Sequence, residues 1–287
     1  MTGHFLRIAG TTAFMILCML LPFLPGPYDP LAVPVSMMPQ TVGTVGLVLV
    51  PVGALWLAVE HWSRLAPIRF AVAITALVAS SLVSGFASLF WMTQSLVLGL
   101  AAFALGGYVV VRILPHLWSL RNATGNATTN ATARLASALP VYLIILPTAL
   151  ALTRLALGDR VADFSRSRAI RNSAALIADI EAYRAANGRY PPSTVSVHPD
   201  YKPSIIGIRE YRYEPSGDAY NVLFEQHSFQ FGTQEIVMYN PRDQQAIASH
   251  ALDVLQNTPE QLALDRTRGH YAVHTAEQPH WKYFWFD

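Results

Sequence analysis

Charged residues are scarce in this chain. Only 13% of its 287 residues are Asp, Glu, Lys or Arg, whereas 52% are hydrophobic, and in soluble globular proteins about a quarter of the residues are charged. An ordinary soluble protein is therefore not expected. Lys and Arg form no block and the formal net charge is only +2, so the sequence predicts no nucleic-acid-binding surface.

Cysteine and the common catalytic motifs are also lacking. Cys18 is the single cysteine and lies within an apolar run, so an internal disulfide is excluded. The sequence contains no Gly-x-Ser-x-Gly nucleophile motif and no glycine loop of the phosphate-binding kind. Composition therefore indicates where the protein lies more clearly than what chemistry it performs.

The few charges are unevenly distributed. Residues 1–157 contain 7 Lys and Arg and 2 Asp and Glu, whereas residues 158–287 contain 13 and 16. A bilayer-spanning helix needs about 20 mostly apolar residues. We therefore expect a transmembrane domain over residues 1–157, with spans at about 5–25, 42–60, 69–90, 95–114 and 137–157. The first span is interpreted as an uncleaved anchor, with a cleaved secretory signal as the alternative.

The positions of Lys and Arg predict an orientation, because cytoplasmic loops retain these residues. If the N-terminus is cytoplasmic, six arginines lie on the inner side: Arg7, Arg64, Arg69, Arg112, Arg121 and Arg134. The outward loops, residues 26–41 and 91–94, contain no Lys or Arg. We expect a bacterial inner-membrane protein with a cytoplasmic N-terminus and a periplasmic domain over residues 158–287.

The predicted spans carry no ionisable residue near their middle. Transporters usually keep such groups for function, so a non-catalytic transporter or secretion subunit is retained only as an alternative. Small residues four positions apart, Ser81 with Gly85 and Ala102 with Gly106, allow helices to approach closely. An oligomer formed through the membrane helices therefore also stays open.

The polar part of the chain begins with a predicted helix that continues the fifth span, with Gly158 as a joint. Apolar residues recur at steps of three and four along one face: Ile170, Ala174, Ile177, Ile180 and Tyr183. Asn187–Gly188 supplies the left-handed residue that ends such a helix, and the prolines that follow prevent its resumption.

The remainder predicts mainly strands. Branched and aromatic residues, bounded by turn residues, predict strands over 208–213, 219–224 and 235–239 and a last strand over 281–286. Helices are expected over 246–255 and 259–265. The fold predicted for residues 158–287 is thus α+β, with a long helix packed on a small antiparallel sheet.

Two segments of this part resemble a known family. The runs Leu176–Arg184 (LIADIEAYR) and Asn187–Pro191 (NGRYP) resemble the end of the long helix of type IV pilins and type II secretion pseudopilins, and Gly217–Leu223 (GDAYNVL) is similar to their first hairpin. The resemblance implies a pilin-like fold, in which a membrane helix continues into a soluble helix covered by a small sheet. It implies no catalytic residue, because pilins are structural proteins.

Histidines and aromatic residues near the end of the chain are the candidate site residues. His270, His274 and His280 are weak metal candidates, since neutral imidazoles that converge with a carboxylate bind zinc. No catalytic residue and no cofactor is predicted. Trp281, Tyr283 and Trp285 form the candidate interaction site, because exposed aromatic side chains anchor partners.

The sequence therefore predicts a membrane protein whose periplasmic pilin-like domain acts as a binding or assembly module, with the lipid bilayer and an envelope protein as partners. The alternative is a membrane-anchored envelope enzyme or metal-binding protein that uses the histidine cluster.

Overall fold

The computed structural model describes residues 2–61, 68–94, 139–194, 200–216, 218–229, 233–249, 252–256 and 271–286, with isolated positions between 96 and 114. The chain divides into two compact units. The first comprises Met1–Met19 and Met37–Ala156, and the second comprises Leu20–Ser36 and Leu157–Asp287. The division near residue 157 coincides with the change in charge composition. The inclusion of Leu20–Ser36 in the second unit was not expected from the sequence.

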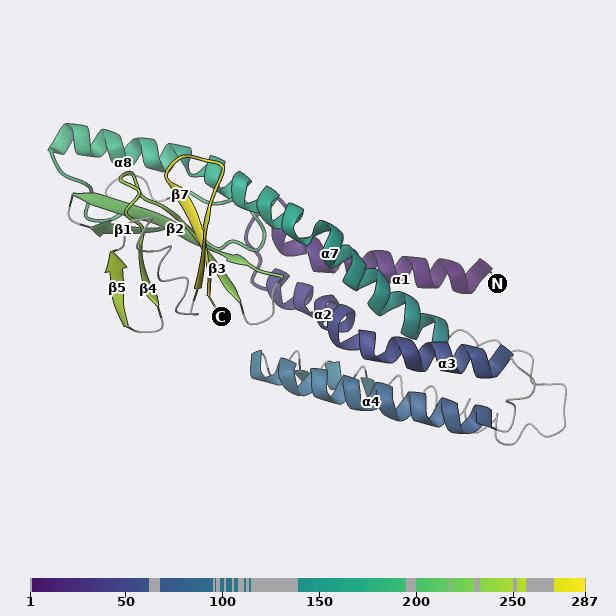
Figure 1. The fold of residues 1–287 in the computed structure, drawn as a ribbon. Coiled ribbons are helices and arrows are strands. Elements are labelled where there is room, and N and C mark those ends of the chain that lie inside the picture. The colour runs from purple at the N-terminus through teal and green to yellow at the C-terminus, as the bar shows by residue number, and fades with distance from the viewer. Residues whose placement is uncertain are drawn as a thin grey trace. The chain divides into compact units, whose positions relative to one another are not determined.

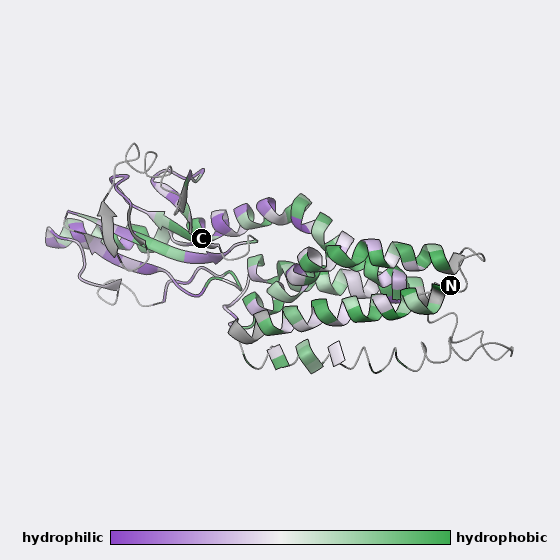
Figure 2. Cartoon of the chain, turned by 60° about the horizontal axis from the view of Figure 1, so that its bottom comes forward, coloured by the Kyte–Doolittle hydropathy of each residue, from purple (hydrophilic) through white to green (hydrophobic). Residues whose placement is uncertain are grey.

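Long apolar helices dominate the first unit (Figures 1 and 2). Among the described residues, four helical stretches are long and apolar enough to cross a membrane: Phe5–Phe23, Ala32–Val59, Phe70–Leu89 and Leu139–Asn187. The first covers most of α1 (Thr2–Leu20) and a 3-10 turn, η1 (Leu21–Phe23), and the third lies in α4 (Arg69–Gln94). The predicted span at 95–114 lies largely outside the described residues.

The second of these stretches begins earlier than predicted. It consists of α2 (Ala32–Val45), η2 (Gly46–Leu49) and α3 (Val50–His61) in succession. The helix therefore begins ten residues before the predicted span, and residues 32–41 of the predicted loop are helical. Pro34 lies in the first turn, where its missing N–H is not needed. Pro39 is tolerated inside the helix.

Glycines allow α2 and α3 to approach the first part of α7 (Leu139–Asn172) closely. A Cβ atom on Gly43 would lie 2.9 Å from the Cβ of Leu150, and one on Gly53 would lie 2.9 Å from the carbonyl oxygen of Pro140. Gly85, by contrast, faces open space. The small residues that matter for packing in this unit are therefore in the second apolar stretch.

Helix α7 runs without interruption from its apolar part into the second unit, so the predicted joint at Gly158 is wrong. The helix passes through Gly158, where an added Cβ would meet the Phe229 ring at 3.3 Å. The break occurs instead at Ser173, whose hydroxyl donates to the carbonyl of Ile170 at 2.7 Å. Helix α8 (Ala174–Asn187) follows and ends at Gly188, which has a φ of 70° as predicted.

A five-stranded antiparallel sheet forms the centre of the second unit (Figure 1). Its strands are β1 (Arg212–Ser216), β2 (Ala219–His227), β3 (Gln234–Tyr239), β6 (Tyr271–Thr275) and β7 (Trp281–Phe286). They lie in the order β1-β2-β3-β7-β6. The predicted strands at 219–224, 235–239 and 281–286 are confirmed. The first strand lies a few residues later than the predicted 208–213.

The core of this unit lies between the helices α7 and α8 and one face of the sheet. Alternate residues of the strands point toward the helices, because successive side chains of a strand face opposite sides. Side chains of both layers are buried there: Ile170, Leu176, Ile180, Tyr220, Val222, Phe224, Val237 and Trp281. The predicted α+β arrangement of a long helix on a small antiparallel sheet is thus confirmed.

The helix predicted over 246–255 is wrong. This segment forms a two-stranded hairpin of β4 (Ala246–Ser249) and β5 (Leu252–Gln256), in which Ile247 pairs with Leu255. A short apolar run satisfies both helical and strand periodicity, so its pattern does not distinguish the two. The helix predicted over 259–265 lies outside the described residues.

Residues 21–31, here called the strap, pack onto the second unit. Four backbone hydrogen bonds of 2.8–3.1 Å fasten it to residues 204–207: Ile206 N–H to Leu24 O, Gly26 N–H to Ser204 O, Asp29 N–H to Ile206 O and Gly207 N–H to Pro22 O. The ring of Phe23 is fully buried and stacks on Phe229 with a centroid distance of 4.7 Å. The connection between α1 and α2 is therefore an integral part of the second unit.

Candidate binding site

A buried ion pair joins α7 to the sheet. The Nε atom of Arg166 donates to Oε1 of Glu235 at 2.8 Å, and its Nη2 atom donates to Oε2 at 3.0 Å. The side chains are only 7% and 2% exposed. Two parallel hydrogen bonds of this kind form the strongest geometry between a guanidinium and a carboxylate, so the pair fixes the helix against β3.

Further side chains complete the network around Glu235. Trp285 of β7 donates its indole N–H to Oε2 at 2.8 Å, and the amide of Gln226 in β2 donates to Oε1 at 3.3 Å. The same Gln226 amide also donates to the carbonyl of Ala162 in α7 at 3.0 Å. The carboxylate therefore connects the helix with three neighbouring strands.

Arg166 has two more neighbours. Its Nη1 atom donates to Asp163, one turn earlier on α7, whose side chain is 62% exposed. Its guanidinium carbon lies 3.6 Å from the ring centroid of Tyr283, within the range of a cation–π contact. Burial raises the pKa of Tyr283 although Arg166 opposes the shift, so this phenol stays neutral at physiological pH.

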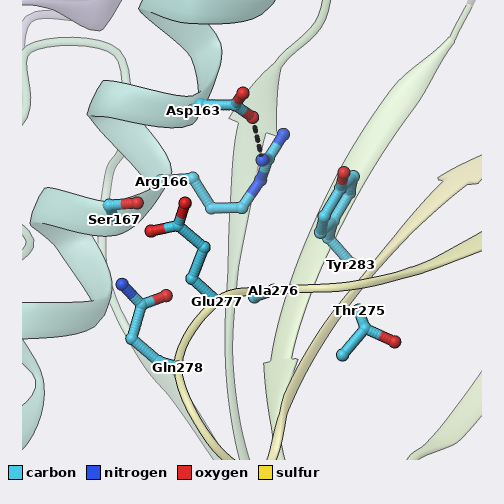
Figure 3. Close-up of a pocket in the computed structure, with 8 residues that line it drawn as sticks. All are labelled: Asp163, Arg166, Ser167, Thr275, Ala276, Glu277, Gln278 and Tyr283. Atoms are coloured by element: carbon cyan, nitrogen blue, oxygen red, sulfur yellow. Dashed lines mark hydrogen bonds and ion pairs between the residues drawn. The ribbon is translucent and has the colours of Figure 1, made fainter.

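Two cavities adjoin Arg166. The smaller, about 150 Å³, lies between α7 and the turn that joins β6 to β7, and Figure 3 shows Glu277 and Gln278 of that turn facing Arg166 and Ser167. The larger, about 250 Å³, is lined by earlier residues of α7, from Gly158 to Arg166, and by side chains of β3 and β7. Both share Asp163, Arg166 and Tyr283 in their walls.

Three neighbouring rings lie on the helix-facing side of β6 and β7, and we call them the aromatic ladder. His274 stacks on Tyr283, and the other two ring pairs are tilted. His274 lies 4.8 Å from Tyr283 and 4.3 Å from Trp285, measured between ring centroids, and the two aromatic rings are 6.1 Å apart. All three side chains are partly exposed. Tyr283 and Trp285 therefore lie both in the ladder and in the wall of the larger cavity.

The three predicted interaction residues occupy different environments. Trp281 is 4% exposed and packs on Phe224 and Tyr239 in the core. Its role in this structure is to close the sheet against the helices. Of the three, Tyr283 and Trp285 are partly exposed.

Of the candidate metal residues, His274 and His280 lie in different surroundings. His274 belongs to the aromatic ladder, whereas His280 lies in the turn before β7 with its Nδ1 atom 3.1 Å from Oδ2 of Asp243. His270 lies outside the described residues. Over the part of the chain that is described, no group of three His, Cys, Asp or Glu side chains is placed to hold a metal ion.

Sequence reasoning did not single out Arg166 or Glu235, although a signal was present. Arg166 lies four residues before Ile170 and therefore on the apolar face of the helix. Glu235 lies two residues before Val237 and four before Tyr239, so all three share the inner face of a predicted strand. Opposite charges on two faces that both pack into the core indicate a buried ion pair.

No protein-family model, no curated protein and no solved structure matches this chain.

Proposed function

We propose that this chain is an integral protein of the bacterial inner membrane that acts by binding or assembly. In this proposal the N-terminus is cytoplasmic and the second unit is a pilin-like module on the periplasmic side. The apolar helices support membrane insertion, and the restriction of basic residues to alternate loops supports the orientation.

The strap supports a five-span arrangement. Because Leu20–Ser36 and Leu157–Asp287 form one unit, both must lie on the same side of the bilayer, so an even number of crossings separates them. Of the four apolar stretches found in the described residues, three lie between the strap and the sheet. The predicted span at 95–114 supplies the fourth crossing, which makes the number even.

Labelling with a membrane-impermeant maleimide tests this topology in a Cys18→Ala background. We expect Tyr28→Cys and Asp218→Cys to be labelled in intact spheroplasts, since these side chains are 44% and 87% exposed. Asn126→Cys, in the predicted cytoplasmic loop, should react only after permeabilisation. Labelling of Asn126→Cys from outside, or protection of Asp218→Cys, would contradict the proposed orientation.

The aromatic ladder is the observation that carries the binding role. Its rings are partly exposed beside two cavities, and aromatic side chains with polar edges are typical anchors at protein interfaces. We propose that an envelope protein docks on Tyr283 and on the neighbouring turn that joins β6 to β7.

Photocrosslinking of the full-length protein in native membranes tests the binding role. Benzoylphenylalanine in place of Tyr283 should yield one discrete protein adduct, and the same group in place of Tyr28, another partly exposed tyrosine, should not yield that adduct. If the protein is folded and membrane-inserted but Tyr283 gives no protein adduct, or if both positions give the same set, the docking proposal is refuted.

A further inference from the structure

The larger cavity has the charge pattern of a cation site. Three carboxylates, from Asp159, Asp163 and Glu235, line it together with the single guanidinium of Arg166. Arg166 already makes a bidentate pair with Glu235, donates again to Asp163 and lies on Tyr283. Its charge is thus neutralised, and the surplus negative charge of Asp159 and Asp163 favours a cation over an anion.

The rest of the lining suits an organic cation rather than a bare metal ion. Phe229, Tyr283 and Trp285 contribute aromatic walls, and aromatic rings attract ammonium groups through their negative faces. The volume of about 250 Å³ exceeds the roughly 30 Å³ that one water molecule occupies in the liquid. A short alkylammonium group therefore fits with room for its hydration.

The positions of Asp159 and Asp163 along α7 indicate the source of the cation. The apolar part of this helix is predicted to end at residue 157, and an α-helix rises about 1.5 Å per residue. Asp159 then lies about 3 Å and Asp163 about 9 Å beyond the hydrocarbon boundary. The polar headgroup layer is about 5–8 Å thick on each side of a bilayer. One carboxylate therefore lies within this layer, and the other lies close to its outer edge.

We infer that this cavity binds the ammonium group of an aminophospholipid from the outer leaflet of the inner membrane. Asp159 and Asp163 pair with the ammonium, and the aromatic walls attract it through their negative faces. The inference rests on the proposed membrane insertion but not on the proposed protein partner. It assigns a lipid-binding role to the beginning of the polar unit.

Competition between two lipids tests this site. The full-length protein in micelles doped with equal amounts of phosphatidylethanolamine and phosphatidylglycerol, carrying identical acyl chains, is analysed by native mass spectrometry. We expect wild-type protein to retain more of the ethanolamine lipid by about fivefold, because a partly exposed charge pair changes a binding constant by about two- to fivefold. In Asp159→Asn/Asp163→Asn the ratio should fall to about one on the same grounds.

A matched variant controls for net charge. Glu210→Gln/Asp218→Asn removes the same two charges from side chains that are 58% and 87% exposed and do not line the cavity, and it should keep the wild-type ratio. Asp159→Asn alone, which disrupts no contact of Arg166, should lower the ratio partly and keeps the test valid if the double variant does not fold.

Three results would overturn the inference. One is equal retention of both lipids by the wild type, and another is a ratio that the cavity variant leaves unchanged. The third is saturation of the site by soluble glycerophosphoethanolamine in micelles free of aminolipid, which would assign the cation to a soluble source. Retention of neither lipid would count against the inference in the same way, whereas membrane insertion is tested separately by the maleimide labelling.

Discussion

Removal of the Glu235 carboxylate should strongly destabilise the second unit. The change Glu235→Ala leaves the Arg166 guanidinium, 7% exposed, without its bidentate partner and deprives the indole N–H of Trp285 of its acceptor. Breaking a buried ion pair by deleting one member costs about 3–5 kcal/mol of unfolding free energy. Glu235→Gln keeps an acceptor oxygen and the side-chain volume, so we expect a loss of about 2 kcal/mol.

The assay is thermal unfolding of the full-length protein in detergent micelles, followed by near-ultraviolet circular dichroism. For a unit of about 150 residues, one kcal/mol corresponds to about 3–4 °C in Tm, so Glu235→Ala should lower Tm by roughly 10–20 °C. The double variant Arg166→Met/Glu235→Gln removes both charges and keeps an acceptor for Trp285. It should be more stable than Glu235→Ala, because no unpaired charge remains buried.

Two results would refute this reasoning. If Glu235→Ala lowers the stability by less than about 1 kcal/mol, Arg166 and Glu235 are not held together in a dry environment. If the effects of Arg166→Met and Glu235→Gln add without coupling, the two side chains do not interact, since contacting residues usually show an interaction energy of about 0.5–3 kcal/mol.

Two further predictions concern the strap. Burial lowers the pKa of His227, which lies beside Phe23, to about 4, so the unfolded chain binds a proton that the native state does not between pH 6.5 and 4. Stability should therefore fall by about 3 kcal/mol as the pH drops through this window. In His227→Gln the midpoint of denaturation should depend less on pH than in the wild type. If the variant shows the same pH dependence as the wild type, this imidazole is not its cause. In Gly207→Ala the new Cβ would lie 2.6 Å from the Pro22 oxygen, which should cost about 1–3 kcal/mol in thermal unfolding, whereas Gly85→Ala, with open space, should cost nothing measurable.

The sequence was sufficient to predict those helices and strands in which apolar residues recur at a regular spacing. The spacing of Ile170, Ile177 and Ile180 identified much of the buried face of α7 and α8, although Ala174 of the same predicted face is exposed and the buried Leu176 was not included. Gly188 marked the end of α8, because a left-handed residue commonly ends a helix. Strands β2, β3 and β7 were predicted because branched and aromatic residues alternate in them.

The errors occurred where distant residues decide the local structure. Residues 32–41 were predicted to belong to a loop, yet they are helical, and Pro34 and Pro39 lie within that helix. The segment 246–255 pairs with itself as a hairpin, which its composition does not reveal. The break near Ser173 also lacked a signal, because no glycine or proline lies at that point of the helix.

The candidate site was harder to predict for the same reason. Arg166 and Glu235 are 69 residues apart, so their pairing depends on the register of β3 under the helix. Sequence reasoning found Tyr283 and Trp285 but grouped them with Trp281, because the alternation of β7 gives all three the same face. Which of them a helix covers is decided only by the packing of α7.

The strap has a consequence for biogenesis. Its residues leave the ribosome long before Ser204–Gly207, with which they form backbone hydrogen bonds. About 180 residues must be made in between, which takes roughly 9–36 s at the usual synthesis rate of 5–20 residues per second. During that time Phe23, fully buried in the finished protein, has no folded partner. A chaperone or the translocation machinery therefore has a defined interval in which to hold this segment.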